Sequence, residues 1–388
     1  MRFAKQCLAA VSVLALLLGI PLAWNTANSF PSNAGTIMPT GNMAVSRSGH
    51  TATLLPDGRV LIAGGMVRNG EFLAGAELYN PTTGTFSQAG EMTSRRVSHR
   101  ASLLPDGKVL ITGGLAGRFR EAGQWYGNVL STVELYDPAT GRFTPAGKMS
   151  SPRNSHAAVS LNDGKVLLLS GGGDRDVLLS SAEVYDHATR TFTPVESMQT
   201  PRIPHVAILL KSGKVLVAGG TGPNRTILAS AELYEPARKN FSSAGSMTVQ
   251  RHKHAATLLA DGRVLITGGS DDRDWNGQYA TAEIYDPTRN SFSPSPQMNL
   301  PRFKHGGAMV LLSSGLALVA GGGAQAEVFQ PATSEFRVVP GSLDEPWHFS
   351  TATPLTDGRV LIAGGYPNTS EATNRAWVYQ PAPKGGSR

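Results

Sequence analysis

A Gly-Gly doublet that follows a short apolar run recurs seven times along this chain of 388 residues. Each doublet comes six or seven residues after an Asp-Gly or Ser-Gly turn signal. Self-similarity at a period of about 50 residues is typical of repeat architectures in which each repeat forms one supersecondary unit. The doublets begin at Gly64, Gly113, Gly171, Gly219, Gly268, Gly321 and Gly364.

One repeat predicts four short antiparallel strands. In the first copy Asp57-Gly58 is a two-residue hairpin turn, and Asn80-Pro81 opens a type I turn. A four-stranded unit repeated seven times predicts an all-β fold, a seven-bladed β-propeller. The expected strands of the first copy span residues 50–55, 59–63, 76–79 and 86–92.

These motifs resemble those of the kelch family. The resemblance rests on the doublets, on Glu-x-Tyr-Asp-Pro at 134–138 and 283–287, and on Phe-x-x-x-Gly-x-Met at 86–92 and 143–149. It covers the chain beyond its first thirty residues, and the Asp-Gly-Lys/Arg-Val-Leu-Ile variant looks most like exported bacterial kelch proteins. The family usually has Trp early in the fourth strand, where this chain has Phe86, Phe143, Phe192, Phe241, Phe292 and Phe336.

The last repeat is incomplete, because the chain has no fourth strand after Tyr379-Gln380-Pro381. The N-terminal stretch 37–43 places Ile37, Gly41 and Met43 at the same offsets as Phe86, Gly90 and Met92. We therefore expect the N-terminal strand to complete the last blade, which leaves no open sheet edge between the two ends.

The first thirty residues have the layout of a secretory signal. Arg2 and Lys5 precede an apolar run over 7–23, and small and polar residues follow. We expect a signal and leader at 1–30, the propeller at 31–383, and a disordered tail at 384–388. The protein is then secreted or periplasmic, with no membrane span in the mature chain; an uncleaved anchor is the alternative.

The chain has one cysteine, Cys7, which lies inside the expected signal. Its removal excludes thiol catalysis and Cys-ligated metals. Galactose oxidases, which share the kelch fold, use copper with a Tyr–Cys cross-link, so the resemblance implies the propeller without that chemistry. We expect no cofactor and no metal.

The net charge of +7 is spread along the chain, without a Lys/Arg-rich run of the kind that follows a nucleic-acid backbone. We expect a monomer that binds no nucleic acid and whose partner is a protein or a glycan.

Binding residues are expected on the face that carries the irregular connections between the second and third strands of each blade, because variable loops on a rigid scaffold usually carry function. The longest of these connections, residues 115–132 in blade two, mixes basic and aromatic residues suited to sugars or to a protein partner; a solvated, mobile loop is the alternative. The candidates in these loops are Arg118, Phe119, Arg120, Trp125 and Tyr126 in blade two, and Trp275 and Tyr279 in blade five.

An Arg-x-x-His motif at the start of six blades allows two interpretations. A ring of guanidiniums at the channel mouth would attract a carboxylate or sulfate, which makes Arg96, Arg153, Arg202 and Arg251 candidates. Alternatively, each Arg or His pairs with the Glu repeated in the third strand. Blade seven has Trp347, Ser350 and Trp377 at these three positions, and their joint loss favours the structural interpretation.

A further pattern in blade five, Asp272-x-Asp274-x-Asn276-Gly277, matches the spacing of a calcium loop. No helices are expected beside it, which favours a plain polar turn. The function expected overall is an exported, non-catalytic binding protein. The alternative is a carbohydrate-active enzyme on the same propeller, such as a kelch-type sialic acid epimerase acting on an anionic sugar.

Overall fold

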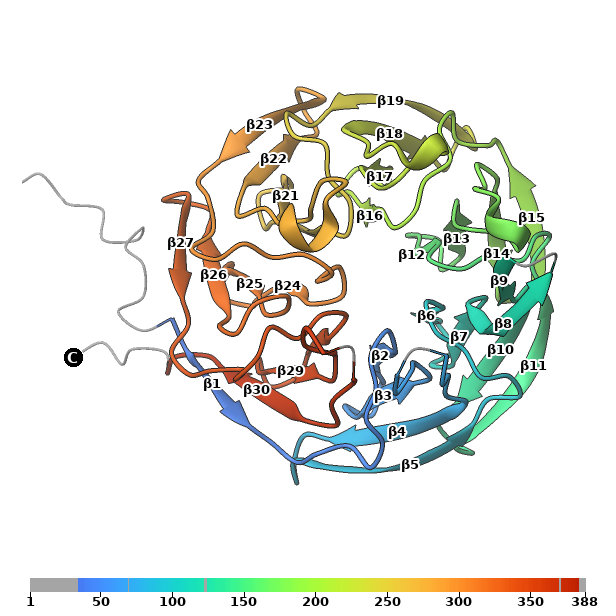
Figure 1. The fold of residues 1–388 in the computed structure, drawn as a ribbon, viewed down its shortest axis with the longest axis horizontal. Coiled ribbons are helices and arrows are strands. Elements are labelled where there is room, and N and C mark those ends of the chain that lie inside the picture. Colours follow the sequence, from blue (N-terminus) through green and yellow to red (C-terminus); the bar gives the residue numbers. More distant parts are fainter. Residues whose placement is uncertain (1–33, 69, 122–123, 370, 384–388) are drawn as a thin grey trace, which may run out of the picture.

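The computed structural model describes residues 34–383, apart from 69, 122–123 and 370. Its strands form seven four-stranded antiparallel sheets arranged radially around a central channel (Figure 1). The predicted seven-bladed propeller is therefore confirmed. Signal, leader and tail, which were predicted at 1–30 and 384–388, lie outside the described residues.

The first three blades follow the chain in order from the inner to the outer strand. Blade one consists of β2 (Thr51–Leu54), β3 (Val60–Ala63), β4 (Gly75–Asn80) and β5 (Thr85–Glu91). Blade two consists of β6 (Arg100–Leu103), β7 (Val109–Thr112), β10 (Thr132–Asp137) and β11 (Arg142–Lys148). Blade three consists of β12 (Ala157–Ser160), β13 (Val166–Leu169), β14 (Ala182–Asp186) and β15 (Thr191–Val195).

The remaining blades repeat this order, and blade seven uses both ends of the described chain. Blade four consists of β16 (Val206–Leu209), β17 (Val215–Ala218), β18 (Ser230–Glu235) and β19 (Asn240–Ser246). Blade five consists of β20 (Ala255–Leu258), β21 (Val264–Thr267), β22 (Ala282–Asp286) and β23 (Ser291–Ser295). Blade six consists of β24 (Met309–Leu311), β25 (Ala317–Val319), β26 (Glu327–Gln330) and β27 (Glu335–Val338). Blade seven consists of β28 (Thr351–Pro354), β29 (Val360–Ala363), β30 (Ala376–Gln380) and β1 (Thr36–Pro39).

The second strand of each blade is buried on both faces, as its continuous apolar run predicts. All four residues of β3 are buried, whereas β5 at the outer rim is mostly exposed. The hydrophobic core therefore lies between neighbouring blades. Leu61 of blade one, for example, shares a cluster of buried side chains with Ile111 and Tyr136 of blade two.

The predicted closure of the ring is confirmed. β1 pairs with β30 in antiparallel register, and Ile37 lies opposite Tyr379 as Phe86 lies opposite Tyr79 in blade one. The fourth strand of blade seven thus comes from the N-terminal end of the described chain. Figure 1 shows this as the blue strand beside the red sheet.

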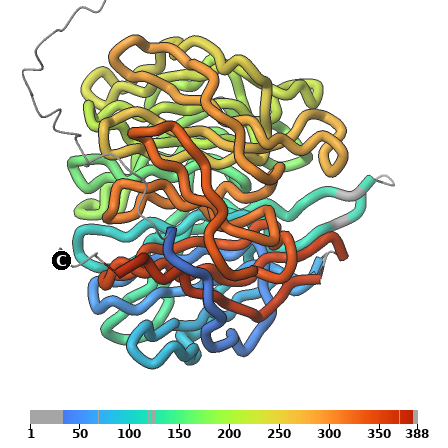
Figure 2. The backbone as a smooth tube through the Cα atoms, turned by 90° about the vertical axis from the view of Figure 1, so that its left-hand side faces the viewer, coloured from blue at the N-terminus to red at the C-terminus, as the bar shows by residue number. Residues whose placement is uncertain are grey.

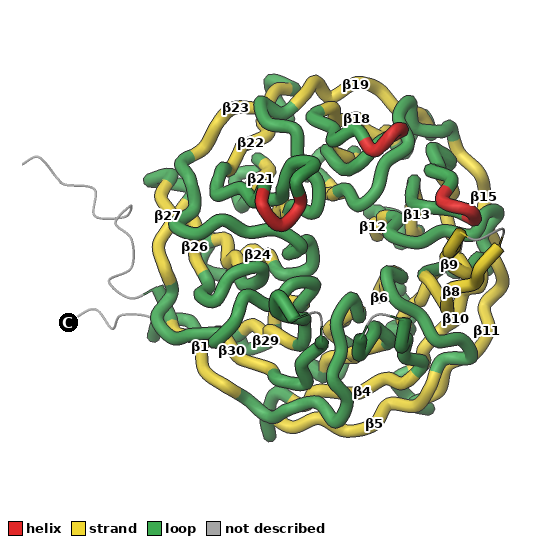
Figure 3. The backbone as a smooth tube through the Cα atoms, in the orientation of Figure 1, coloured by secondary structure: helices red, strands yellow, loops and turns green. Residues whose placement is uncertain are grey.

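The long connection in blade two is more ordered than the expected irregular loop. It forms a two-stranded hairpin of β8 (Leu115–Glu121) and β9 (Gln124–Val129), which stands out from one face of the ring (Figure 2). The corresponding connections of blades three, four and five each carry a single 3-10 turn, shown in Figure 3. These are η2 (Asp174–Asp176), η3 (Pro223–Arg225) and η4 (Asp274–Asn276). Among the residues described, no helix is long and apolar enough to cross a membrane.

Candidate functional site

Each arginine of the Arg-x-x-His motif forms a buried ion pair with the glutamate of the third strand of its own blade. The six Arg–Glu distances lie between 2.5 and 3.0 Å, and each arginine is at most 1% exposed. Burial lowers the pKa of each arginine, although the paired glutamate opposes the shift. The pairs are Arg47–Glu77, Arg96–Glu134, Arg153–Glu183, Arg202–Glu232, Arg251–Glu283 and Arg302–Glu327.

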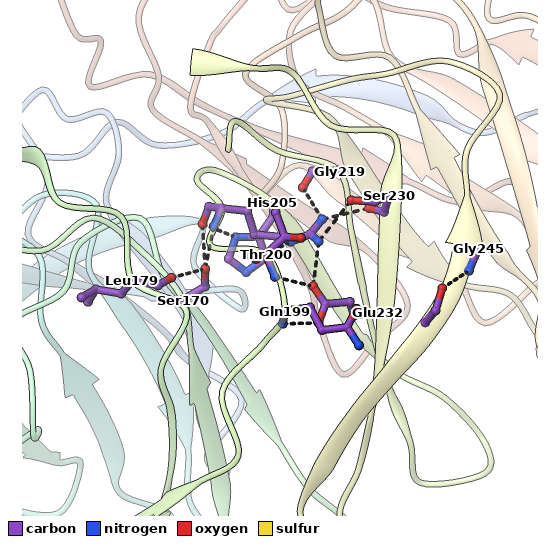
Figure 4. Close-up of polar contacts among 11 residues, drawn as sticks. Ser170, Leu179, Gln199, Thr200, His205, Gly219, Ser230, Glu232 and Gly245 are labelled. Carbon is purple, nitrogen blue, oxygen red and sulfur yellow. Dashed lines mark hydrogen bonds and ion pairs between the residues drawn. The ribbon is translucent and has the colours of Figure 1, made fainter. Parts of the chain in front are cut away.

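The glutamate of each pair also links its blade to the preceding one. In blade four, Glu232 accepts hydrogen bonds from the backbone N–H groups of Gln199 and Thr200, which follow the outer strand of blade three. Arg202 donates to the carbonyl oxygen of Gly219 and to that of Ser230 (Figure 4). The Arg202–Glu232 pair and its backbone partners thus give each buried charge the hydrogen bonds that it needs away from water. The same contacts hold the two blades together.

The first glycine of the doublet makes room for the histidine of the next blade. A Cβ on Gly64 would lie 2.6 Å from the carbonyl oxygen of Arg96 and 2.8 Å from Cε1 of His99. Gly64 also has a φ of +63°, in the left-handed region that favours glycine. The doublet and the Arg-x-x-His motif are therefore two halves of one inter-blade contact. Blade three differs by one residue, because Ser170 takes the first position there, with a φ of +60°.

The histidines do not pair with the repeated glutamates, which corrects that part of the structural interpretation. His99, for example, contacts the hydroxyl of Thr51 in the preceding blade through Nε2 at 3.1 Å. Only the arginines form the predicted pairs. In blade seven the lost ion pair is replaced by a contact between Trp347 and Trp377, whose ring centroids lie 5.7 Å apart.

Four of the candidate ligand-binding residues belong to these buried pairs. Their guanidiniums contact protein oxygens and are covered by the blades, so we leave them out of the proposed site. They are Arg96, Arg153, Arg202 and Arg251.

Replacing Glu183 by Gln should lower the free energy of unfolding by about 3–5 kcal/mol. The change leaves the charge of Arg153 buried without its counter-charge. Water cannot reach the buried guanidinium to solvate it in place of the carboxylate. Urea unfolding measures the loss. Glu335→Gln is the matched control, because its ion pair with Arg337 is exposed and such pairs contribute about 0–1 kcal/mol. Equal, small effects of both variants would contradict a stabilising role for the buried pair.

The β8–β9 hairpin and the connections of blades three and four enclose a groove of about 850 Å³ on one face of the ring. Arg118 and Tyr126 of the hairpin, two of the candidates named in blade two, line it. The lining of the groove combines apolar side chains with polar and charged ones. Its other lining residues include Leu115, Val129, Asn154, Asp176, Leu178, Pro201, Ile203, Thr221, Pro223, Asn224 and Arg225.

An exposed ion pair beside this groove joins the hairpin to the connection of blade three. Glu121, at the end of β8, accepts hydrogen bonds from Nε and Nη2 of Arg175 in η2, both at 3.2 Å. Arg118 and Arg225 are exposed, and neither side chain has a hydrogen bond or ion pair with another described residue. The groove therefore presents two cationic donors beside Tyr126.

The other candidates of the hairpin are placed by its register. Arg120 is exposed on β8 and lies opposite Trp125, and Phe119 lies opposite Tyr126. The side chains of Phe119 and Trp125 lie outside the described part of the structure, so both residues stay predictions.

Trp275 belongs to a second cluster, near the channel mouth. Its ring meets Phe303 and His348 edge-on, with centroids 4.9 and 4.8 Å away, and Nζ of Lys304 lies 3.8 Å from its centre. Burial, with Asp274 opposing it, lowers the pKa of Lys304 to about 8. Tyr279 lies under the guanidinium of Arg251, at 5.7 Å. The two aromatic candidates of blade five thus contact protein cations.

The calcium pattern of blade five is occupied by protein contacts. The carboxylate of Asp274 lies 2.6 Å from Nζ of Lys253, and Glu283 is held by Arg251. No group of three His, Cys, Asp or Glu side chains able to hold a metal is found among the residues that the structure describes. The geometry favours the polar turn.

Sequence reasoning missed the part of the groove that blades three and four supply. Asp176, Asn224 and Arg225 lie in the 3-10 turns η2 and η3, where the chain reads Gly-Asp-Arg-Asp and Gly-Pro-Asn-Arg. The shared length and polarity of these two connections is the signal that could have joined them to blade two.

Comparison with known proteins agrees with this architecture. The Kelch motif matches residues 47–93, 96–150, 152–199 and 251–299, which is roughly half of the chain. The chain belongs to the kelch family. A search among curated proteins found no match.

The kelch chain is also similar in structure to a fungal alcohol oxidase of the AA5 family that was solved in complex with copper. The TM-score is 0.69 with 20% identity, over 90% of this chain and 77% of that one. This likeness concerns the fold, a galactose oxidase-like propeller. Among the described residues no three His, Cys, Asp or Glu side chains form a group that could hold a copper ion, and we derive no chemistry through one. A kelch propeller is consistent with a binding role.

Proposed function

We propose that this kelch propeller is an exported protein that binds a carbohydrate in the groove between the β8–β9 hairpin and the connections of blades three and four. The observation that carries the proposal is the groove itself. It combines Tyr126 with Arg118, Arg225 and several apolar side chains in one lining.

The chemistry of the lining suits a sugar better than a flat apolar partner. Tyr126 offers an aromatic face for the apolar side of a pyranose ring, while Asn154, Asp176 and Asn224 offer acceptors and donors to its hydroxyls. Two arginines against one aspartate favour a glycan that carries negative charge. Export remains part of the proposal and rests on the signal-like layout of residues 1–30.

The epimerase alternative receives no support from the ring of arginines that suggested it. The guanidiniums of Arg96, Arg153, Arg202 and Arg251 bind glutamates of their own blades and not a substrate. Binding without turnover is therefore the function we propose.

Binding to an array of neutral and anionic glycans tests the proposal. We expect Tyr126→Ala and Arg225→Ala each to weaken binding about tenfold, as truncation of a central anchoring residue usually does. Arg238→Ala is the matched control, because Arg238 is an exposed arginine in the turn between β18 and β19 of the same blade as Arg225. We expect it to bind like the wild type.

Two results would overturn the carbohydrate proposal. One is that none of the glycans binds; the other is that both groove variants bind as tightly as Arg238→Ala. A secreted protein that binds instead, and is lost in the same variants, would keep the groove but change the class of ligand.

A further inference from the structure

The innermost strands of the blades enclose a cavity of about 340 Å³ in the central channel. Its volume lies in the range of small-molecule pockets, which is about 300–1,000 Å³. The described residues that line it include three cationic side chains, Arg100, Lys253 and Lys304, and neither aspartate nor glutamate. Lys253 and Lys304 both contact Asp274 at the mouth, so Arg100 is the cation whose charge is not balanced there.

Arg100 is exceptional among equivalent positions of the repeat. It begins the first strand of blade two, and the other blades have uncharged residues there. The one hydrogen bond of its side chain within the described structure joins Nη1 to the carbonyl oxygen of His99, at a long 3.4 Å. Arg100 is half-buried at the wall of the cavity, and burial lowers its pKa. The equivalent residues are Thr51, Ala157, Val206, Ala255, Gly306 and Thr351.

Two imidazoles with unpartnered nitrogens line the same cavity, those of His205 and His254, and His205 is the one whose other nitrogen contacts a backbone carbonyl. In four blades the equivalent histidine contacts a threonine hydroxyl of the preceding blade through Nε2, at 2.9–3.2 Å. For His205 the two positions that supply this threonine are Ala157 and Leu169. Nε2 of His205 consequently has no hydrogen-bond partner among the described residues, although the residue is only 7% exposed. The pairs with threonine are His50–Thr351, His99–Thr51, His156–Thr112 and His305–Thr267.

The protonation of His205 follows from its other nitrogen. Nδ1 lies 3.1 Å from the carbonyl oxygen of Arg202, which can only accept, so Nδ1 carries the proton. Burial, and then the charges of Arg202 and Arg100, lower the pKa of His205 to about 3, so the ring is neutral at pH 7. Nε2 is therefore a buried acceptor that needs a donor, and a second anionic oxygen would be repelled there.

The two groups belong to adjacent parts of the cavity. Nε2 of His205 lies on the side where Ala157 replaces threonine, and Ala157 begins the strand next to that of Arg100. A small molecule that carries a carboxylate and a hydroxyl would offer each of the two groups the partner that it lacks.

We propose that the central cavity binds a small hydroxycarboxylate, with its carboxylate on Arg100 and its hydroxyl donating to Nε2 of His205. A guanidinium pairs with a planar carboxylate through two parallel hydrogen bonds. The hydroxyl supplies the donor that Ala157 does not. This site is separate from the groove, and its test does not depend on the proposed function.

Calorimetry and thermal unfolding with lactate and propionate, which differ by one hydroxyl, test the proposal. We expect the wild type to bind lactate about fivefold more tightly than propionate, which corresponds to one hydrogen bond. At ten times Kd, lactate should raise Tm by about 3 °C.

Three variants separate the two contacts. Arg100→Thr, which introduces the residue that blades one and seven have at this position, should abolish binding of both acids. Ala157→Thr supplies the missing partner of His205, so it should raise Tm without ligand and remove the preference for lactate while propionate still binds. Arg142→Thr, an equal charge change in the exposed outer strand β11 of the same blade, should behave as the wild type.

The proposal is overturned if Arg100→Thr binds lactate like the wild type, or if the wild type does not distinguish the two acids. Should Arg100→Thr fail to fold, Arg100→Gln provides the same comparison with a side chain of similar length.

Discussion

Lowering the pH from 7 to 5 is expected to unfold the propeller, because its buried histidines cannot take up protons in the folded state. Burial is the largest cause in every case, and the charge of the neighbouring arginine adds to it. Burial and the arginine charge together lower the pKa of His50, His205 and His305 to about 3. They lower the pKa of His99, His156 and His254 well below the usual 6.5.

The sign follows from proton linkage. Between pH 6.5 and about 3 the unfolded chain binds protons at these six positions and the folded chain does not, so acid favours unfolding. Their contribution to stability is fully present above pH 6.5 and is lost as the pH falls. Each histidine removes about 1.4 kcal/mol per pH unit once the pH is below its unfolded value. Six of them together exceed the ordinary 5–15 kcal/mol of a domain within about two pH units.

Urea unfolding at pH 7.5, 6.5, 5.5 and 5.0 measures the effect. We expect little change between the first two values and a steep fall below them. His305→Gln keeps a polar side chain that cannot titrate. The slope of its unfolding free energy against pH should therefore be smaller than that of the wild type by the amount that corresponds to about one proton. A flat stability between pH 7 and 5 would show that the imidazoles gain protons without unfolding.

Most of the fold could be predicted because the same sequence motifs recur in all seven repeats. The doublets, the Asp-Gly turns and the aromatic residues of the third strand set the blade, and Ile37 with Met43 revealed the missing strand. The Arg–Glu pairing could also be predicted, because Trp347 and Trp377 replace both partners together in blade seven.

The sites were harder to predict because they arise between repeats. Arg118 and Tyr126 could be predicted from the basic and aromatic composition of their loop. The groove also contains Asp176 and Arg225 from two other blades, and the spacing of these residues along the chain does not show that they lie close together. His205 is important because the preceding blade has no threonine at the positions that bind the equivalent histidines, and Arg100 because its position is uncharged in the other blades. That comparison becomes possible only once the ring places Ala157 beside both of them.

A chain that begins at residue 45 should unfold roughly 5–10 °C below one that begins at residue 34. The two differ by β1 and the segment that follows it. Ile37 is buried between blades six and seven, and Met43 is buried between blades seven and one. Burying each side chain contributes about 1.5–3 kcal/mol, so their joint loss costs about 5 kcal/mol before any backbone contact is considered. In a domain of this size each kcal/mol shifts Tm by about 1–2 °C, which gives the expected shift.

The backbone contacts increase the cost, because β1 closes the ring on both of its sides. Ile37 donates its N–H to the carbonyl oxygen of Pro340 in the connection from blade six, and Met43 donates to that of Asn374 in blade seven. Without this strand, β30 exposes an unpaired edge, which invites pairing with another chain. A peptide of residues 34–45 added in trans should therefore restore part of the lost Tm, whereas a scrambled peptide should not. Equal melting temperatures of the two chains would mean that the contacts between the other six blades hold the ring without its closing strand.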